Sequence, residues 1–517
     1  MSRLAAVPLF SPALPPSVAL IPASPPTPAA PPEARHDQGV DWSLVVRLRR
    51  RAAAEITAAT QAHLAAHGTP MPTDDRRMMG RSVVRGIVRQ HAEQLSASGA
   101  ALWPIAIEQL YARALEDGIF GYGRLQPLFE IPHAENIEIN GCGVVRVQYA
   151  DGRRRAMLPV ADSDEELVDA IRFLGESASP TRPFDDLHPT MTLALGDRFR
   201  LHAIGFGLSH RPSVTIRQHI LTDITLRDLV ARDMLPEALA RFLHAAVLAR
   251  KSIVIAGDQG AGKTTLLRAL VAAIPHTERF GTIETDYELL THLQPGRENV
   301  VALQARVGMG ELHDGRRIGE VTVADLIPEA LRQNLMRLVV GEVRGSEAGA
   351  MFEAMSSGAG TLSTTHSHSS AAIMDRLASR VAQGGVLTIG EAYRQIAHNI
   401  DLLVHIRLTD DTWRGGLRRR YVSEVRQVTG SVESDRPTTH LTYATDPDGR
   451  PQSFHPDAAF WSDLAPYDHA WDDRGQGHRG DRGQGHRGDR GRDDRGDRGQ
   501  GDRGDGGGTA GQCGGRR

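Results

Sequence analysis

The chain has 517 residues, which is too many for one hydrophobic core and suggests roughly two to four domains. Hydrophobic residues make up 40% and charged residues 24%, which are ordinary proportions for a globular protein. The formal net charge is −3 and the isoelectric point lies near 6.8. Nucleic-acid binding requires a concentrated basic surface, so we expect no direct nucleic-acid partner.

Cysteine content and hydropathy bear on the cellular location. The two cysteines, Cys142 and Cys513, lie far apart and make neither a disulfide framework nor a metal site, which favours a reducing compartment. The most apolar stretch, Leu235 to Ala256, is interrupted by charged residues, so we expect no transmembrane segment. These features predict a cytoplasmic protein, any membrane contact of which would be through partners.

Both ends of the chain have a composition typical of disorder. Residues 1–38 are rich in proline and alanine, which predicts a disordered arm. Residues 471–517 repeat Asp, Arg and Gly with almost no apolar side chain, which predicts a flexible, solvated tail. An interaction tail is the alternative interpretation. Residues 431–470 are interpreted as a C-terminal extension.

The segments that follow the N-terminal arm change in periodicity. Residues 39–120 show a helical rhythm, which we expect to break at Gly118, Gly121 and Gly123. Residues 121–222 then change to short strands, which predicts a smaller α+β domain. The elements expected there are a hairpin of 137–140 with 144–147, a helix over 164–174, and strands over 199–204 and 213–216.

Residues 223–430 alternate between strand and helix patterns. This alternation predicts an α/β domain with a parallel sheet and crossover helices. The strands expected are 253–256, 281–284, 338–340 and 361–365. We expect 402–407 and 420–428 to complete the sheet as an antiparallel edge.

The strongest motif is a phosphate-binding loop from Gly257 to Thr264, which matches G-x-x-x-x-G-K-[ST] in full. A β-branched run enters the loop and a helical run leaves it, so backbone N–H groups and a helix N-terminus would face a phosphate. Lys263 is expected to bridge the β- and γ-phosphates of ATP, and Thr264 to bind Mg²⁺. A glycine-rich turn with a chance Lys-Thr is the alternative. The residues expected to contact ATP are Gly257, Gly260, Ala261, Gly262, Lys263, Thr264 and Thr265.

Acidic and histidine side chains follow three of the predicted strands. Glu284 and Glu288 follow one strand and Glu342 ends another, where carboxylates can hold a metal or orient water. His366 ends a third strand, where it could sense the γ-phosphate. For the segment with Glu284 and Glu288 the alternative is an ordinary helix cap. For Glu342 it is a solvated acid at a strand end, and for His366 a polar histidine at a strand end.

Together these motifs resemble the secretion-ATPase superfamily of type II and type IV systems over roughly residues 115–430. The run Gly341 to Gly345 followed by Glu347-Ala348 is specific to that superfamily. The branch that it resembles is the CpaF/TadA-type ATPases of Flp (tight-adherence) pilus assembly, relatives of the VirB-type traffic ATPases. The resemblance implies a RecA-like P-loop domain preceded by a smaller α+β, PAS-like domain. It also implies a ring-forming homo-oligomer, a hexamer, working with integral membrane proteins of the pilus or secretion apparatus.

The resemblance also implies residue roles. The catalytic glutamate is matched best by Glu288, with Glu284 beside it, and Glu342 is the Walker B acid, binding the metal with Thr264. His366 lies in the histidine motif of Thr364 to Ser369. Asn136 to Gly141 resembles the family's hairpin of the N-terminal domain. Segments 197–200 and 215–217 resemble its arginine-bearing strands, so the arginines expected at the nucleotide are Arg217 first, then Arg198 or Arg200. Each of these could instead be a surface arginine.

Three departures separate this sequence from the family pattern. The acidic box reads Glu284-Thr-Asp-Tyr-Glu288 in place of Glu-Asp-Thr/Pro-x-Glu. Residues 357–360 replace the first histidine of the histidine box, and Leu335-Met336 replaces a Pro-Asp. Because both end glutamates remain, we expect an ATPase that drives pilus assembly or secretion. The alternatives are a nucleotide-binding switch with little turnover and a conjugation-type nucleic-acid transport ATPase.

Overall fold

The computed structural model describes residues 40–178, 181–196, 198–306, 308–313, 316–343, 347–356, 360–385 and 387–473. The arm predicted at 1–38, and the tail predicted at 471–517 apart from its first three residues, lie outside this description. Within the described ranges, no helix combines the length and the apolar composition that crossing a bilayer requires.

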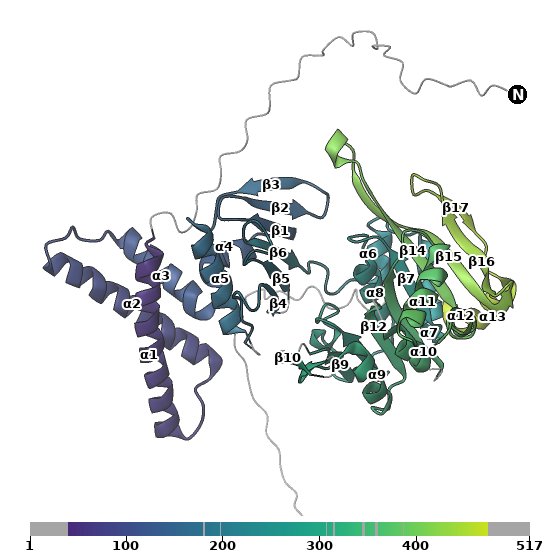
Figure 1. Ribbon diagram of the computed structural model, residues 1–517, viewed down its shortest axis with the longest axis horizontal. Coiled ribbons are helices and arrows are strands. Elements are labelled where there is room, and N and C mark those ends of the chain that lie inside the picture. The colour runs from purple at the N-terminus through teal and green to yellow at the C-terminus, as the bar shows by residue number, and fades with distance from the viewer. Residues whose placement is uncertain are drawn as a thin grey trace, which may run out of the picture. The chain divides into compact units, whose positions relative to one another are not determined.

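Three helices, α1 (Trp42–His67), α2 (Thr73–Ala97) and α3 (Ile105–Phe120), pack together around their own apolar core (Figure 1). The Asp41 side chain caps α1 by accepting from the N–H of Ser43 and Leu44. The helical rhythm predicted for this region is confirmed. The break predicted at Gly118 is wrong, because this glycine lies inside α3 with Arg49 packed closely over it, and the helix ends at Gly121.

An antiparallel sheet follows, here called the N-terminal sheet, with strand order β3-β2-β1-β6-β5-β4. The predicted hairpin is confirmed, since β1 and β2 pair with Ile137 opposite Val147. The predicted helix is also confirmed as α5 (Asp164–Ser177), whose apolar side packs into the core of this sheet. The elements are β1 (Ala134–Asn140), β2 (Val145–Tyr149), β3 (Arg154–Met157), β4 (Thr190–Leu195), β5 (Phe199–Ile204), β6 (Ser213–Gln218), η1 (Gly123–Leu125) and α4 (Gln126–Phe129).

A mixed sheet forms the second half of the chain, here called the phosphate-loop sheet, with strand order β17-β16-β15-β14-β7-β13-β12-β8-β9. Its strands are β7 (Ile253–Gly257), β8 (Phe280–Glu284), β9 (Val300–Gln304), β12 (Arg337–Val343), β13 (Thr361–His366), β14 (Leu402–Asp410), β15 (Arg418–Glu433), β16 (Arg436–Thr445) and β17 (Pro451–Phe454). The α/β class is confirmed. The expectation that 402–407 is antiparallel is wrong, because β14 runs parallel to β7 and the antiparallel edge begins at β15.

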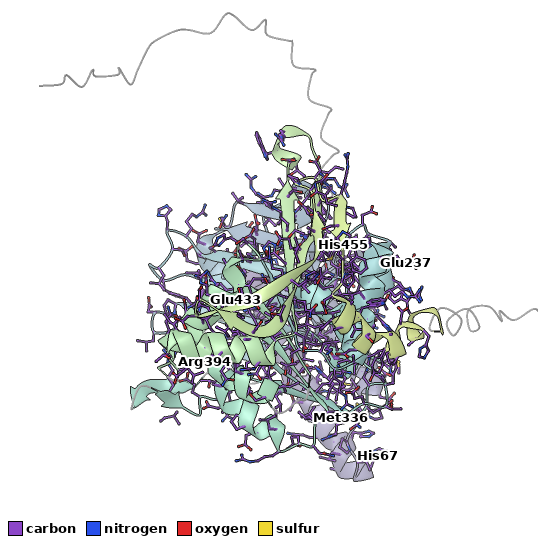
Figure 2. All side chains as sticks on the ribbon, turned by 90° about the vertical axis from the view of Figure 1, so that its right-hand side faces the viewer. His67, Glu237, Met336, Arg394, Glu433 and His455 are labelled. Carbon is purple, nitrogen blue, oxygen red and sulfur yellow. The ribbon has the colours of Figure 1, made fainter. Side chains whose placement is uncertain are left out.

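Helices flank the phosphate-loop sheet and bury its central strands. Every residue of β7 is buried, which explains the β-branched run before the phosphate loop. Figure 2 labels Glu237, which begins α7, Glu433, which ends β15, and His455, which follows β17. The remaining elements are α6 (Leu226–Val230), α7 (Glu237–Leu248), α8 (Lys263–Ala272), η2 (Thr291–Leu293), β10 (Met309–His313), β11 (Arg316–Ile318), α9 (Val323–Leu331), α10 (Glu347–Ser356), α11 (Ala372–Gln383), α12 (Ile389–Asn399), η3 (Thr412–Arg414), α13 (Ala458–Asp468) and α14 (Ala470–Asp473).

The register of the parallel strands brings the candidate site residues to one edge. Gly257 at the end of β7 pairs with His366 at the end of β13. Val340 of β12 pairs with Ile283 of β8, so Glu284 lies beside Gly341, the residue immediately before Glu342. The carboxyl ends of parallel strands are where ligands bind in open α/β sheets.

Two glycines of α2 provide a matched test of the helical core. A Cβ on Gly80 would lie 2.3 Å from Phe120 Cζ, whereas a Cβ on Gly86 meets nothing within 4 Å. Gly80→Ala is therefore expected to destabilise the protein by about 1–3 kcal/mol through overpacking. Gly86→Ala is expected to stabilise it by roughly 0.5–1 kcal/mol through helix propensity. Thermal unfolding followed by circular dichroism measures both, and equal shifts for the two variants would contradict the packing described.

Candidate functional site

The phosphate loop needs glycine for steric reasons at its first position. A Cβ on Gly257 would lie 2.4 Å from the carbonyl oxygen of Ile406 on the neighbouring strand β14. Gly260 and Gly262 adopt φ of 74° and 98°, a region that disfavours other residues. The loop therefore has the compact backbone that permits close approach of a phosphate, and α8 begins directly after it.

Lys263 is folded over this loop. Its side chain is buried, and Nζ donates to the carbonyl oxygens of Gly257 at 3.1 Å and Asp258 at 3.0 Å. Nζ also lies 3.2 Å from His366 Nδ1. The ammonium group thus lies against the backbone of the phosphate loop and contacts β13, the strand beside β7 in the sheet.

His366 connects Lys263 to Glu342. Its Nε2 lies 2.7 Å from Glu342 Oε1, while its Nδ1 faces the lysine. An ammonium group can only donate, so Nδ1 must accept and the imidazole proton belongs on Nε2, facing the carboxylate. The structure therefore brings together three residues that the sequence placed at the site separately.

Glu288 lies in the segment between β8 and η2, and its carboxylate faces the start of α8 and positive charges from the N-terminal sheet. Its carboxylate is 2.7 Å from Arg200 Nη1 and 3.5 Å from Thr264 Oγ1. Burial alone raises the pKa of Glu288, but the positive charge of Arg217 and the ion pair with Arg200 outweigh it and hold the pKa below its usual value. Glu288 is therefore an ionised carboxylate next to the hydroxyl of the phosphate-loop threonine.

Glu284 lies beneath this segment. Its Oε1 accepts from the N–H groups of Glu288 at 3.0 Å and Leu289 at 2.9 Å, so it holds the acidic segment in place. Burial raises the pKa of Glu284 to about 7. A Cβ on Gly341 would lie 3.0 Å from Glu284 Cγ, which explains a glycine immediately before Glu342.

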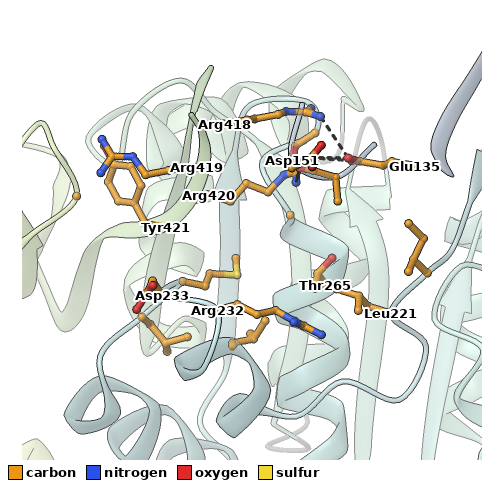
Figure 3. Close-up of a pocket in the computed structure, with 18 of the residues that line it drawn as sticks. Glu135, Asp151, Leu221, Arg232, Asp233, Thr265, Arg418, Arg419, Arg420 and Tyr421 are labelled. Carbon is orange, nitrogen blue, oxygen red and sulfur yellow. Dashed lines mark hydrogen bonds and ion pairs between the residues drawn. The ribbon is translucent and has the colours of Figure 1, made fainter. Parts of the chain in front are cut away.

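A pocket of about 1090 Å³ opens beside the phosphate loop (Figure 3). Residues of both sheets line it, with Thr264, Thr265 and Glu288 on one side and Arg217 on the other. His219 also lines it, and burial followed by the charge of Arg268 lowers its pKa to about 4, so it is neutral at pH 7. The volume of the pocket is slightly above the usual range for ligand pockets, which is about 300–1,000 Å³.

The arginines predicted at the site differ in their placement. Arg200 makes direct ion pairs with Glu288 and Asp286, and Arg217 lies opposite it on β6 and lines the pocket. Arg198 precedes β5 in a turn, where its carbonyl accepts from His219, and among the described residues it is not part of the pocket lining. Three other segments of the predicted motifs, residue 197 and the ranges 344–346 and 357–359, lie outside the description.

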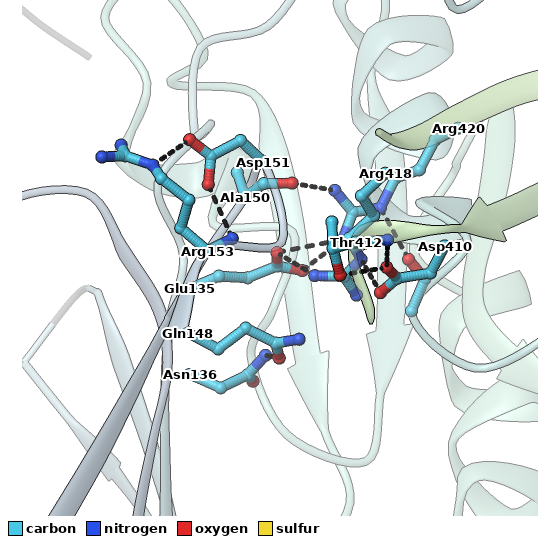
Figure 4. A network of polar contacts seen from close by, with 11 residues as sticks. Glu135, Asn136, Gln148, Ala150, Asp151, Arg153, Asp410, Thr412, Arg418 and Arg420 are labelled. Carbon is cyan, nitrogen blue, oxygen red and sulfur yellow. Dashed lines mark hydrogen bonds and ion pairs between the residues drawn. The ribbon is translucent and has the colours of Figure 1, made fainter. Parts of the chain in front are cut away.

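Three residues at the site were missed by motif reading. Arg418 and Arg420 on β15 contact Glu135 on β1, and Arg420 Nε also donates to Gly260 O at 2.7 Å (Figure 4). They belong to no phosphate-binding motif. The sequence signal is a run of three consecutive arginines, 418–420, before the apolar part of β15, and the first and third of them lie on one face of the strand.

Comparison with known proteins identifies the family. The model for "Type II/IV secretion system protein" matches residues 185–434. A Mycobacterium tuberculosis protein named for conjugal transfer is 30% identical over 339 residues, 62% of this chain and 89% of its own length. This chain belongs to the type II/IV secretion system protein family.

Two further proteins of secretion systems are similar to this chain over more than half of its length. VirB11 of Agrobacterium fabrum is 28% identical over 328 residues, 56% of this chain and 91% of its own. The crystal structure of the VirB11 ATPase from the Brucella suis type IV secretion system, in complex with sulphate, is 26% identical. The match covers 59% of this chain and 92% of the Brucella suis VirB11 chain, with a TM-score of 0.30.

The side chains of this secretion-family protein fit a magnesium–nucleotide complex better than a free metal ion. Among the described residues, no group of three or more His, Cys, Asp or Glu side chains could hold a metal alone. Mg²⁺ usually binds through one or two protein oxygens and completes its shell with phosphates and water. The Thr264 hydroxyl, with the carboxylates of Glu288 at 3.5 Å and Glu342 across His366, provides oxygen donors of this kind.

The raised pKa of Glu284 makes stability depend on pH. Between its ordinary value of 4.5 and about 7, folded Glu284 holds a proton that the unfolded chain has lost, so stability falls as pH rises through this window. Glu284→Gln is expected to lose this decline and to be more stable than wild type at pH 8, by up to ~3 kcal/mol.

Melting temperatures from pH 4 to 8, without nucleotide or Mg²⁺, measure the effect. Glu93→Gln on the exposed side of α2 is the control for a surface carboxyl change. A Glu284→Gln variant that follows the wild-type profile at every pH would show that this carboxyl titrates normally.

Proposed function

We propose that this protein is an ATP-hydrolysing motor that powers Flp/Tad-type pilus assembly or protein secretion across the cytoplasmic membrane. One observation carries the proposal: the phosphate loop, Glu288 and the N-terminal arginine Arg217 line the same pocket. Such a site contacts both sheets at once, so binding and release of ATP can move one against the other.

The ATP phosphates would lie on the phosphate loop, against the residues Gly257, Gly260, Ala261, Gly262, Lys263, Thr264 and Thr265. Lys263 would exchange its contacts with the loop carbonyls for the phosphates, which are the stronger acceptors. The less polar end of the pocket, at Leu229, Met234 and Tyr421, suits the base. Mg²⁺, held by Thr264 and Glu342, would neutralise charge on the β- and γ-phosphates.

For hydrolysis, the ionised Glu288 would orient the attacking water by accepting one of its protons in a hydrogen bond. Arg200 and Arg217 would keep this carboxylate ionised and would offset negative charge that develops on the γ-phosphate. His366 would hydrogen-bond Glu342 through Nε2. Its Nδ1 would respond when Lys263 changes its contacts on binding the phosphates. Glu284 would support the site by accepting from the N–H groups of Glu288 and Leu289, whereas Arg198, which is not among the described residues that line the pocket, would not contact the nucleotide.

The assembly that we propose is a hexameric ring of the CpaF/TadA branch. It would be cytoplasmic, held peripherally at the cytoplasmic membrane by integral membrane proteins of the pilus or secretion apparatus. We also propose the domain division 1–38, 39–120, 121–222, 223–430, 431–470 and 471–517, with a PAS-like N-terminal sheet and a RecA-like phosphate-loop domain. The Brucella suis VirB11, named as a type IV secretion system protein, supports the secretion role.

A second function has one observation in its favour. The Mycobacterium tuberculosis relative is named for conjugal transfer, which favours a conjugation-type nucleic-acid transport ATPase. Salt-sensitive DNA binding by the purified protein would support this alternative. The net charge of −3 speaks against it.

Hydrolysis of ATP by the purified protein with Mg²⁺ tests the proposed function. Lys263→Ala should abolish turnover and weaken ATP binding, because it removes the ammonium from the loop. Glu288→Gln should lower turnover by at least about 100-fold while keeping ATP binding, because it removes the acceptor for the water. Tight ATP binding without turnover in the wild type would indicate a regulatory switch instead of a motor.

The oligomeric state tests the ring. Light scattering coupled to size-exclusion chromatography, with and without Mg²⁺ and ATPγS, should give the mass of a hexamer in at least one condition. A 56.1 kDa monomer in both conditions would contradict the ring.

A further inference from the structure

One guanidinium group joins the phosphate loop to the N-terminal sheet. Arg420 Nε donates to Gly260 O at 2.7 Å, Nη1 donates to Ala150 O at 3.2 Å, and Nη2 contacts the two carboxylate oxygens of Glu135 at 2.7 and 2.9 Å. The first partner belongs to the phosphate loop, and the other two belong to the N-terminal sheet and its β2–β3 turn. All three guanidinium nitrogens are used, so the planar group holds both sides at fixed geometry.

The contact with Gly260 fixes a central peptide of the loop. The carbonyl oxygen of Gly260 accepts from Arg420, and the N–H of Ala261 in the same peptide donates to Asp258 O at 3.2 Å. Because the peptide is planar, holding both groups determines its orientation. Phosphate binding by such loops depends on how the backbone N–H groups are oriented.

Glu135 is the anchor on the opposite side. It also accepts from Arg418 Nη1 at 3.2 Å, and the side chains of Glu135 and Arg418 are only 16% and 7% exposed. Charged hydrogen bonds that are shielded from water in this way are stronger than surface ion pairs. The turn beside them is closely packed, since a Cβ on Gly152 would lie 2.7 Å from Thr412 Cγ2 (Figure 4).

We propose that Arg420 is a positioning residue that couples the conformation of the phosphate loop to the N-terminal sheet, with Glu135 as its anchor. Movement of the N-terminal sheet is then transmitted to Gly260 through one side chain, independently of the arginines that face Glu288. The proposal rests on the proposed function, because it describes how the same pocket is prepared for ATP.

The direction in which one substitution changes ATP affinity distinguishes this coupling from a simple effect of charge. Glu135 lines the pocket and carries a negative charge, so its removal should strengthen the binding of anionic ATP if only charge matters. If Glu135 anchors Arg420, its removal releases the loop and weakens binding. Glu135→Gln keeps the shape of the side chain and removes the charge.

Calorimetric titration with ATPγS and Mg²⁺ measures the affinity. We expect Glu135→Gln to raise Kd about fivefold and Arg420→Gln about tenfold, the size expected when charge-assisted hydrogen bonds are lost. Arg420→Lys should fall between wild type and Arg420→Gln, because an ammonium group cannot span both partners. In turnover assays KM should rise with kcat nearly unchanged. Arg414→Gln, in the same hairpin and paired with Asp411, is the control and should match wild type.

Hydrogen exchange without nucleotide tests the coupling separately from ATP binding. The amides of residues 257–264 should exchange faster in Glu135→Gln than in wild type, although Glu135 lies on the other sheet, and should be unchanged in Arg414→Gln. A wild-type protein that binds no ATP would refute the proposed function while this measurement still tests the bridge. Unchanged exchange together with unchanged or stronger ATPγS binding in Glu135→Gln would overturn the proposal.

Discussion

The parallel pairing of β7, β13, β12 and β8 is the constraint on which the candidate site depends. It places Gly257 opposite His366 and brings the ends of β8 and β12 together. Gly257 and the side chains of Glu342, Lys263 and His366 then meet at one sheet edge, the last two from positions 103 residues apart. A shift of one residue in any of these pairs would turn a side chain to the opposite face and dismantle the site.

Charge compensation across the two sheets is the second requirement. Glu288 is largely shielded from water, and a carboxylate in such a place stays ionised only with positive partners. Among the described residues, the ion pair of Glu288 comes from Arg200 of the N-terminal sheet. The site is therefore complete only when both sheets contribute, and this is the physical basis of the proposed coupling between ATP hydrolysis and relative movement.

The sequence allowed local features to be predicted far better than contacts across the fold. The phosphate loop and the β1–β2 hairpin follow from adjacent residues whose chemistry determines the turn, and both could be located in advance. Gly118 was misjudged because its position inside α3 depends on Arg49 packing over it, a contact that no local pattern encodes. Likewise β14 could not be oriented, since its direction is set by pairing with β7, whose residues lie 149 positions earlier in the chain.

The site arginines show the same limit. Arg198 and Arg200 are equivalent by sequence, but only the strand register places Arg200 opposite Arg217 and next to Glu288. The contact of Arg420 with Glu135 joins residues 285 positions apart and carries no motif, so only the fold could reveal it.

The central claim is that ATP is held by both sheets at once, and the most direct measurement is ATPγS affinity in two matched variants of the N-terminal sheet region. Arg217→Gln removes an arginine that lines the pocket, and Arg198→Gln removes one that does not. The account predicts that Arg217→Gln raises Kd by about tenfold or more while Arg198→Gln leaves it unchanged. Equal, wild-type affinity in both variants would contradict it, because ATP would then be bound by the phosphate-loop sheet alone.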